Sequence, residues 1–409
     1  MKFQSVKGTK DILPDESYKW QYVEQRVRAV FERFGYREIR TPIFEETALF
    51  QRGIGETTDI VGKEMYSFQP DPNSESLTLR PEMTASVVRA YLQHHLGSQA
   101  PLVKVYYIAE LFRKERPQAG RQRQFWQFGC ECLGSPNPEA DAEVIALMMM
   151  IYRELGIRRT TLRLNSLGNA ETRKTYRSVL REYLRPHYNA LDEVSKERFE
   201  KNPLRILDSK NPDLQELIRQ APRIIDYLDD ESRAHFEAVQ AFLTDFDIPF
   251  VIDPCLVRGL DYYSRTAFEL QSEDLGAQDA LGGGGRYDML SVLLGGDAPV
   301  PAVGFASGME RLMIAMEKHH LFDSLRPPAP TVMIVAQSDS ARQWAIGAAY
   351  LFRKEGIATE VDILRRSLKA QLREANRMQA KYAVIAGESE LQSGKFQLKN
   401  LQTGEQQAL

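Results

Sequence analysis

The sequence is poor in cysteine and has no long hydrophobic run, and these two shortages exclude several classes of protein. Its 409 residues include three cysteines (Cys130, Cys132 and Cys255), too few for a disulfide framework, which fits a reducing compartment. The longest apolar run, residues 144–152, has nine residues, far below the roughly 20 that span a bilayer. The first residues show no apolar segment of the signal-peptide kind. We therefore expect a soluble, cytoplasmic protein with no membrane partner.

Neither sign of charge is in large excess. The chain has 53 Lys and Arg against 56 Asp and Glu, a net charge of −3, which argues against a protein coated in basic surface. The charge is uneven, because residues 326–409 hold 12 basic and 8 acidic residues, and residues 113–123 hold five basic residues around one acid, Glu115. Local basic patches on an acidic body favour selective polyanion binding. For the C-terminal stretch alone, a solvated charged surface is the simpler interpretation.

Proline marks the clearest boundary in the chain. Residues 326–330 form a proline-rich linker that neither a helix nor a central strand accommodates. Beyond it, strand patterns at 331–336, 359–363 and 382–386 alternate with helical patterns at 340–355 and 367–379. This alternation predicts that residues 331–409 form a separate α/β domain with a mainly parallel sheet.

The part before the linker, residues 1–325, has the pattern of an α+β domain. Helices are predicted from about residue 16 to 34, ending at Gly35, and from Pro138 to about 156 with Asn137 as the cap. A charged helical stretch at about 170–246, broken at Pro186, Pro203 and Pro212, indicates an inserted helical subdomain.

Two strand-like runs, residues 103–113 and 123–133, flank the basic loop. Because alternate residues of a strand share a face, Trp126, Phe128, Cys130 and Cys132 belong to one apolar face that we expect to be buried. The opposite face carries Phe125, Gln127, Gly129 and Glu131, and in the first run Tyr107 and Arg113 share a face.

If the two runs pair as an antiparallel hairpin, their polar faces can line one pocket below the loop. The guanidinium of Arg113 suits phosphate oxygens, the Phe125 ring can stack on a purine, and Glu131 can take an ammonium group. An ordinary hairpin with a solvated polar face explains the same pattern, so both interpretations stay open at this point.

Three further clusters combine polar side chains with turns: residues 79–84, 257–263 and 282–288. Gly282–Gly285 would allow close approach of a ligand to the backbone, but the run does not match G-x-G-x-x-G, which disfavours a dinucleotide dehydrogenase. Cys130 and Cys132 lack partners at zinc spacing, and we expect no protein-bound metal.

Taken together, these segments resemble the histidyl-tRNA synthetase family of class II aminoacyl-tRNA synthetases, over essentially the whole chain. The similar segments are VKGTKD at 6–11, GYREIRTP at 35–42, FRKERPQ at 112–118 with GCE at 129–131, RGLDYY at 258–263, GGRYD at 284–288 and GFASGMERL at 304–312. The resemblance implies an antiparallel-sheet catalytic core with a helical insertion and a C-terminal anticodon-binding domain. It also implies a homodimer, with residues 35–42 at its interface.

The resemblance implies a role for each matched position. Catalysis would depend on Arg113 and Arg258, with Arg258 beside the α-phosphate where other class II enzymes place a metal ion. The ATP site would contain Arg113 at the α-phosphate, Glu115 and Phe125 at the adenine, and Arg121 and Arg311 at the outer phosphates. The histidine site would contain Glu82, Thr84, Tyr107, Gln127, Glu131 and Tyr263. The tRNA acceptor end would meet Arg116, Gln118 and Arg123.

The implied reaction has two steps. L-Histidine is activated by ATP, bound with Mg²⁺, to histidyl-adenylate and pyrophosphate, and the histidyl group then passes to the 3′ end of tRNA(His). Because two anions must meet in the first step, positioning and charge neutralisation carry the catalysis. No protein nucleophile is needed, and no convincing Ser/His/Asp or Cys/His set is present.

Two departures from the family pattern bear on the site. Met83 stands where the family usually has glycine, and its side chain could narrow the histidine pocket; we expect that local rearrangement tolerates it. Trp126 replaces a usual histidine, but strand alternation places it on the core face.

Two other functions compete with the ligase. One is a catalytically silent, synthetase-like regulatory subunit of ATP phosphoribosyltransferase, and the other is a nucleotide- or tRNA-binding module without catalysis. The first typically lacks the anticodon domain and several active-site residues, whereas this chain retains both; the second leaves the histidine-pocket residues unexplained.

Overall fold

The computed structural model describes residues 3–55, 58, 60–209, 211–257, 260, 262–272 and 280–408. The chain divides into two compact units, Met1–Ser324 and Leu325–Leu409, at the start of the proline cluster. Among the described helices, none is long and apolar enough to cross a membrane.

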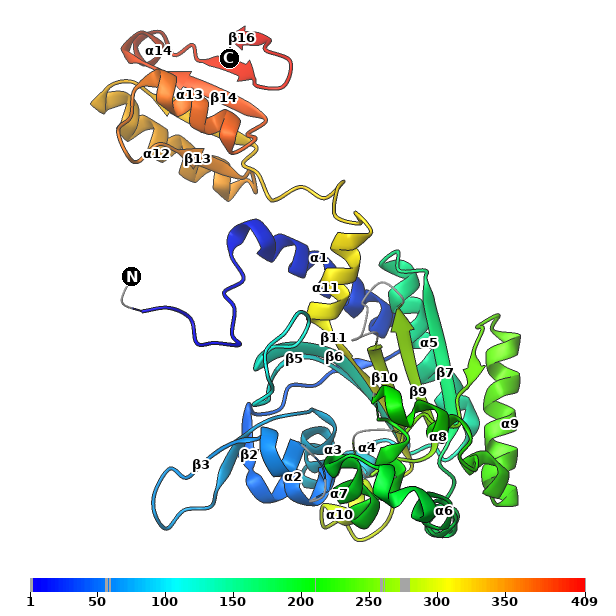
Figure 1. Cartoon of the computed structure of the whole chain (residues 1–409). Helices are drawn as coiled ribbons and strands as arrows, with labels where there is room; N and C mark the ends of the chain where they lie inside the picture. The colour runs from blue at the N-terminus through cyan, green and yellow to red at the C-terminus, as the bar shows by residue number, and fades with distance from the viewer. Residues whose placement is uncertain are drawn as a thin grey trace. The chain divides into compact units, whose positions relative to one another are not determined.

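The first unit is built on an eight-stranded sheet (Figure 1). The six central strands pair antiparallel in the order β5 (Val103–Phe112), β6 (Gln124–Leu133), β11 (Ala302–Gly308), β10 (Ala280–Arg286), β9 (Ser264–Ser272) and β7 (Thr160–Ser166). At the two edges, the short strands β1 (Arg37–Glu38) and β8 (Val251–Ile252) pair in parallel with β5 and β7. The antiparallel sheet that the family resemblance implied is therefore present.

Strands β5 and β6 form the predicted hairpin, each ending within one residue of its expected bounds. Tyr107 lies opposite Gly129, and Ala109 lies opposite Gln127, so the face that carries Gln127 and Glu131 also carries Tyr107. On the other face Phe128 and Cys130 are buried, while Trp126 is half-buried. The assignment of the two faces from strand alternation is confirmed.

Helices α1 (Pro14–Arg33) and α5 (Pro138–Glu154) cover the apolar face of the sheet. The Phe31 ring of α1 stacks on Tyr106 at 4.7 Å between centroids, and Tyr152 of α5 packs 6.4 Å from Phe128. Both helices begin with proline in the first turn, where no amide hydrogen bond is lost. Asn137 precedes α5 as expected, but its side chain makes no capping hydrogen bond.

The second face of the sheet shares a core with α3 (Thr84–Gln93), α6 (Ala170–Leu184) and α10 (Leu290–Leu293), through a cluster that includes Tyr107, Val87, Tyr176 and Leu290. Beside α3 lie α2 (Thr47–Ile54), α4 (Leu96–Gln99), the short π-helical segment η1 (Ile60–Glu64) and a three-stranded sheet in the order β2 (Phe44–Glu46), β4 (Leu77–Leu79), β3 (Tyr66–Phe68). Helix α11 (Met309–Lys318) follows β11 directly.

The predicted helical insertion lies between β7 and β8. It contains α6, α7 (Glu193–Lys201), α8 (Gln215–Arg219) and α9 (Asp230–Asp245), joined by the 3₁₀ segments η2 (Arg185–Ala190), η3 (Pro203–Ile206), η4 (Pro212–Leu214) and η5 (Ile224–Tyr227). Pro186, Pro203 and Pro212 stand in the first turns of η2, η3 and η4. These prolines therefore end the α-helical pattern by starting tighter turns rather than open loops.

The second unit is the expected α/β fold. Its sheet has the order β13 (Thr359–Val361), β12 (Val332–Ala336), β14 (Tyr382–Ala386), β15 (Gln397–Asn400) and β16 (Gln406–Ala408). The first three strands are parallel, and the last two add an antiparallel hairpin that the sequence patterns did not predict. Helices α12 (Asp339–Lys354), α13 (Leu368–Arg377) and α14 (Glu388–Ser393) connect the strands, and separate apolar clusters contain alternate residues of β12 such as Ile334 and Met333.

Candidate active site

Two adjoining cavities open on the polar face of β5, β6, β10 and β11. The outer cavity has a volume of about 240 Å³ and the inner one about 190 Å³. Arg113, Gln127, Gly283 and Ala306 line both of them. The two spaces therefore meet at the Arg113 guanidinium, and a reaction between two bound molecules can take place there.

All five residues that the resemblance implied for ATP line the outer cavity: Arg113, Glu115, Arg121, Phe125 and Arg311. The Glu115 carboxylate lies 2.6 Å from Arg121 Nε and 3.7 Å from Arg113 Nη1. Arg113 also lies over the Phe125 ring, 5.2 Å from its centroid, and its Nε donates to the Pro81 carbonyl at 2.8 Å. An aromatic face beside clustered guanidinium groups suits a nucleoside polyphosphate.

Arg311 illustrates the electrostatics of the outer cavity. Its Nη1 donates to the Ala280 carbonyl at 2.6 Å and its Nε to the Gly120 carbonyl at 3.3 Å, so it joins β10 to the basic loop. Burial lowers the pKa of Arg311, and the positive charge of Arg121 lowers it further. Crowded cations of this kind are stabilised by a bound polyanion.

All six residues implied for histidine line the inner cavity: Glu82, Thr84, Tyr107, Gln127, Glu131 and Tyr263. Glu131 is 1 % exposed and accepts hydrogen bonds from Thr84 Oγ1 at 2.8 Å, Tyr107 OH at 3.5 Å and Tyr287 OH. Burial raises the pKa of Glu131 to about 8, although these hydrogen bonds oppose the shift. A buried carboxyl held by three hydroxyls is a fixed partner for a polar ligand ring.

Glu82 has a second, structural task. Its carboxylate accepts from the backbone amides of Thr84 at 2.7 Å and Ala85 at 2.8 Å, and so caps the start of α3. Burial raises the pKa of Glu82 in spite of these bonds. The cap holds Glu82 and Thr84 at the inner cavity.

Sequence reasoning assigned no role to several residues that line the cavities, among them Tyr262 and Tyr287 in the inner one and Glu269 and Glu310 in the outer one. Glu310 accepts from the Trp126 amide at 2.9 Å, and burial raises its pKa to about 7. Tyr287 stands in the segment at 284–288 that the sequence analysis singled out, but it received no role there. No local signal singles out Glu269.

Two glycines of the run line the cavities, and the other two are needed for packing within the protein. Gly282 lines the outer cavity and Gly283 lines both cavities. A side chain at Gly284 would instead meet the Gly304 carbonyl oxygen at 1.9 Å, and one at Gly285 would meet Tyr263 at 2.9 Å. A further glycine, Gly304, is required because a Cβ there would lie 1.8 Å from Glu131 Oε2. The small residues mainly let protein groups approach one another.

Met83 lies in the wall of the inner cavity and is 1 % exposed. Its φ of −102° suits any L-residue, so glycine is not needed for the backbone there. The sulfur lies 4.0 Å from Thr41 Oγ1, and the side chain belongs to the core cluster under β5.

We expect Met83→Gly to leave histidine activation nearly unchanged, within about threefold in KM, while lowering the free energy of unfolding. Truncating a buried methionine costs about 2–5 kcal/mol, and glycine at the start of a helix adds backbone freedom. Thermal unfolding and steady-state exchange kinetics on the same preparation test this. A variant that activates histidine much faster than the wild type would show that Met83 obstructs the pocket.

The basic loop between β5 and β6 exposes two of the three residues implied for tRNA. Arg116 and Gln118 are exposed, and Gln118 pairs with Arg121 through two backbone hydrogen bonds of 3.0 and 2.9 Å. Arg123 instead donates to the carbonyls of Glu115 and Lys7 at 3.3 and 3.4 Å, and so ties the N-terminal segment to the loop. Arg258 lies outside the described residues.

Within the described ranges, no group of three or more His, Cys, Asp or Glu side chains could hold a metal ion. Cys130 and Cys132 are buried on the face away from the cavities, and burial raises the pKa of Cys132 to about 11. Both are unmodified thiols in the core.

An antiparallel sheet core with two adjoining cavities at its strand hairpin, followed by a separate α/β unit, is the architecture of a class II aminoacyl-tRNA synthetase. Residues 8–312 match the family described as histidyl-tRNA synthetase, and residues 331–409 match the anticodon binding domain.

Relatives and solved structures agree. The chain is 67 % identical to the histidine–tRNA ligase of Chloroherpeton thalassium over 99 % of this chain and 95 % of the relative, and 59 % identical to that of Chlorobaculum parvum over 99 % and 94 %. It superimposes on the crystal structure of apo S. aureus histidyl-tRNA synthetase with a TM-score of 0.83 at 38 % identity, covering 100 % of this chain and 97 % of the other. The chain belongs to the histidyl-tRNA synthetase family.

The activity follows from this membership. The chain is an enzyme that ligates L-histidine to tRNA(His) by way of histidyl-adenylate, and its separate C-terminal unit is an anticodon-binding domain. The matches favour this activity over that of a regulatory subunit of ATP phosphoribosyltransferase.

Proposed function

We propose that the outer cavity binds ATP and the inner cavity binds L-histidine, and that the first reaction step takes place where they meet. The observation that carries this proposal is the shared lining: Arg113 and Gln127 belong to both cavities. A histidine carboxylate placed at this junction attacks the α-phosphorus in line while pyrophosphate leaves into the outer cavity. Effective molarity and charge neutralisation by Arg113 supply the rate enhancement.

The remaining side chains divide between the two substrates. Phe125 stacks on the adenine, Glu115 binds its edge, and Arg121 and Arg311 hold the outer phosphates. Glu131 and Tyr263 bond the two imidazole nitrogens, while Glu82, Thr84, Tyr107 and Gln127 complete the amino-acid site. A site built from polar partners rejects analogues that lack them by orders of magnitude.

ATP enters this scheme as its Mg²⁺ complex. Magnesium binds phosphate oxygens and keeps several waters, so it would be held mainly by the ATP phosphates. We assign the remaining neutralisation at the α-phosphate to Arg258, as the family resemblance implies.

We further propose that Arg116 and Gln118 meet the acceptor end of tRNA(His), because they are exposed at the tip of the loop over the outer cavity. Arg123 holds the loop in place rather than contacting tRNA, since its guanidinium bonds backbone carbonyls. Residues 1–325 are the catalytic core, and residues 331–409 read the anticodon after the linker at 326–330.

A homodimer in the cytoplasm is also part of the proposal. Support comes from the surface after β1, where Ile43 and Phe44 are 45 % and 51 % exposed and the Phe44 ring meets Phe68 at 6.4 Å. Large apolar side chains gathered on a surface are typical of protein interfaces. ATP and tRNA, the two substrates besides histidine, are cytoplasmic molecules.

The experiment that tests the assignment is ATP–pyrophosphate exchange. We expect exchange that depends on histidine and is at background with each of the other amino acids, because Glu131 and Tyr263 need a polar ring. Folded protein that shows no exchange in the presence of histidine and Mg²⁺ would contradict the assignment and favour a regulatory subunit.

A further inference from the structure

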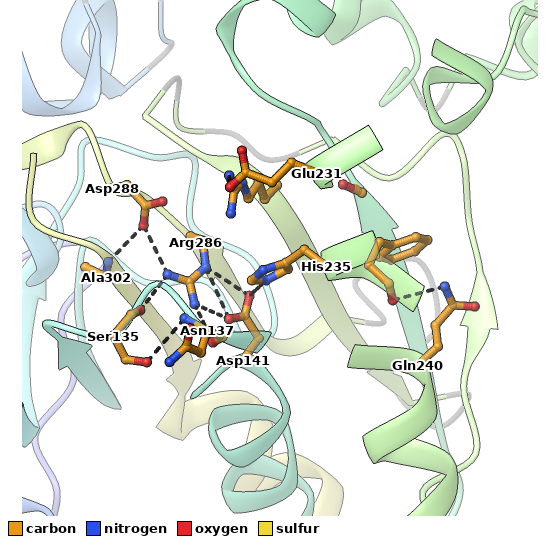
Figure 2. Close-up of polar contacts among 12 residues, drawn as sticks. Ser135, Asn137, Asp141, Glu231, His235, Gln240, Arg286, Asp288 and Ala302 are labelled. Carbon is orange, nitrogen blue, oxygen red and sulfur yellow. Dashed lines mark hydrogen bonds and ion pairs between the residues drawn. The ribbon is translucent and has the colours of Figure 1, made fainter. Parts of the chain in front are cut away.

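A buried ion pair lies behind the inner cavity and takes no part in the chemistry above. Arg286 ends β10, Asp141 lies in the first turn of α5, and neither side chain is exposed. Figure 2 shows the Arg286 guanidinium enclosed by polar groups from several segments. Its Nε lies 3.2 and 3.3 Å from the two Asp141 oxygens, and its Nη2 binds the same carboxylate.

The remaining donors of Arg286 are also used. Nη1 donates to the Ser135 carbonyl at 2.8 Å and to Asp288 Oδ1 at 3.2 Å, and Nη2 donates to the Asn137 carbonyl at 3.1 Å. The guanidinium fork is thus fully bonded within the protein. Arg286 cannot serve a ligand directly, so any effect on the reaction must pass through its neighbours.

The neighbour that matters is Tyr287. Its hydroxyl donates to Glu131 in the inner cavity, and its backbone amide donates to the Ala302 carbonyl at 2.8 Å. Asp288, on the other side, accepts from Arg286 and from the Ala302 amide at 2.9 Å. Arg286 and Asp288 therefore clamp the backbone on both sides of Tyr287.

Strand pairing alone does not set this geometry. The pairing of β10 with β11 stays regular to Arg286, but its pairing with β9 shifts register between Gly285 and Arg286, so one side of the strand end lacks a regular neighbour. At such irregularities the ladder no longer dictates the direction of the next side chain. The pair formed by Asp141 and Arg286 supplies the missing constraint.

We propose that Asp141 and Arg286 are positioning residues for the amino-acid site: they hold the end of β10 so that the Tyr287 hydroxyl meets Glu131, and they thereby set the affinity for the imidazole side chain. This inference rests on the proposed binding of histidine in the inner cavity. The ion pair acts on histidine and not on ATP, because Tyr287 lines only the inner cavity.

The helical insertion supplies a third member of the cluster. His235 of α9 places Nε2 at 3.3 Å from Asp141 Oδ1, and Figure 2 shows it on the side of Asp141 away from Asp288. Burial by itself raises the pKa of Asp141, but the charge of Arg286 and the contact with His235 lower it below its usual value. The Asp141 carboxylate therefore stays charged, and His235 of α9 contacts it from the helical insertion.

A double-mutant cycle tests the proposal in the full-length enzyme. We expect Asp141→Asn to raise the KM for histidine in pyrophosphate exchange by roughly tenfold and to change the KM for ATP less than about twofold. In a Tyr287→Phe background, Asp141→Asn should raise the KM for histidine by less than about a further threefold, because both substitutions act through the Tyr287 hydroxyl. Additive effects, or equal rises in both KM values, would overturn the proposal.

Two further variants keep the result interpretable. Removing one partner of a buried pair can unfold a protein, whereas replacing both by apolar residues is often tolerated, so Asp141→Leu combined with Arg286→Met serves if Asp141→Asn does not fold. A folded double variant with wild-type KM for histidine contradicts the positioning role. The control is Asp362→Asn in the C-terminal unit, where the buried Asp362 pairs with a partly exposed Arg366; it should leave the KM for histidine unchanged.

Histidine-dependent exchange by the wild-type enzyme distinguishes failure of this inference from failure of the proposed function on which it rests. Absence of histidine-dependent exchange in the wild type would refute histidine binding itself. Normal wild-type exchange with unaltered variants would refute only the role of the ion pair.

Discussion

Glu131→Gln is expected to reduce histidine-dependent pyrophosphate exchange by about 10²–10³-fold or more. The wild-type carboxyl accepts hydrogen bonds from the hydroxyls of Thr84, Tyr107 and Tyr287 and can form a further hydrogen bond to the ligand. The amide of glutamine places an NH₂ group where the wild type has an accepting oxygen, so hydrogen bonds to the hydroxyl partners and to the ligand are lost. ATP binding, measured by calorimetry, should persist, because Glu131 does not line the outer cavity. A variant with near-normal exchange would remove Glu131 from the histidine site.

The same substitution should change the pH dependence of stability, so that the variant gains stability relative to the wild type as pH rises. The pKa of Glu131 is about 8 in the folded protein, against a reference value of 4.5. Between these values the folded state holds a proton that the unfolded state releases, so raising the pH lowers the free energy of unfolding, by about 1.4 kcal/mol per pKa unit. Glutamine has no such proton. Thermal unfolding at pH 5.5 and 8.5 should show the Tm of the variant rising relative to the Tm of the wild type; a relative fall would contradict a buried carboxyl that holds its proton.

Arg113→Ala is expected to lower the rate of adenylate formation by about 10³-fold, with a smaller effect on histidine binding. Arg113 is the cation at the junction of the two cavities, held by the Pro81 carbonyl and placed over Phe125. Two anions must meet there, and alanine leaves their charge without its nearest counterion. Single-turnover formation of histidyl-adenylate at saturating ATP and histidine measures the step directly.

A neighbouring arginine provides the control. Arg116 is exposed in the loop, so Arg116→Ala should leave adenylate formation within about twofold and should raise the KM for tRNA(His) in the aminoacylation assay. Equal loss of adenylate formation in both variants would mean that the whole loop, rather than Arg113, carries the effect.

Much of the site was predictable because it follows from patterns among residues that are close in the sequence. Alternation along β6 placed Gln127 and Glu131 on one face and Phe128 on the other, and this period of two depends only on strand geometry. The basic loop, the cap at Asn137 and Pro138, and the proline cluster are likewise short patterns. Roles for Glu115, Arg121 and Arg311 came from resemblance, since no local pattern distinguishes them from surface charges.

Other features depend on contacts between distant parts of the chain. Tyr287 and Glu131 are 156 residues apart, and Arg286 and Asp141 are 145 apart. Gly304 looks like any small strand residue until β11 lies beside β6, where its missing Cβ makes room for the Glu131 carboxyl. For Met83 the structure adds the reason for the expected tolerance: the side chain lies in the core and the backbone conformation is an ordinary one.

The sequence by itself determined the two-unit organisation and the hairpin with its two faces, because periodicity and turn chemistry are properties of neighbouring residues. The side chains proposed to bind the nucleotide and the amino acid were mostly indicated by the family resemblance. Only the tertiary structure decided that these side chains divide between two cavities that meet at Arg113, and that a buried ion pair stands behind Tyr287. The tertiary structure also decided the burial of Glu131 and its pKa of about 8. They arise from the exclusion of water by segments that are far apart in the chain.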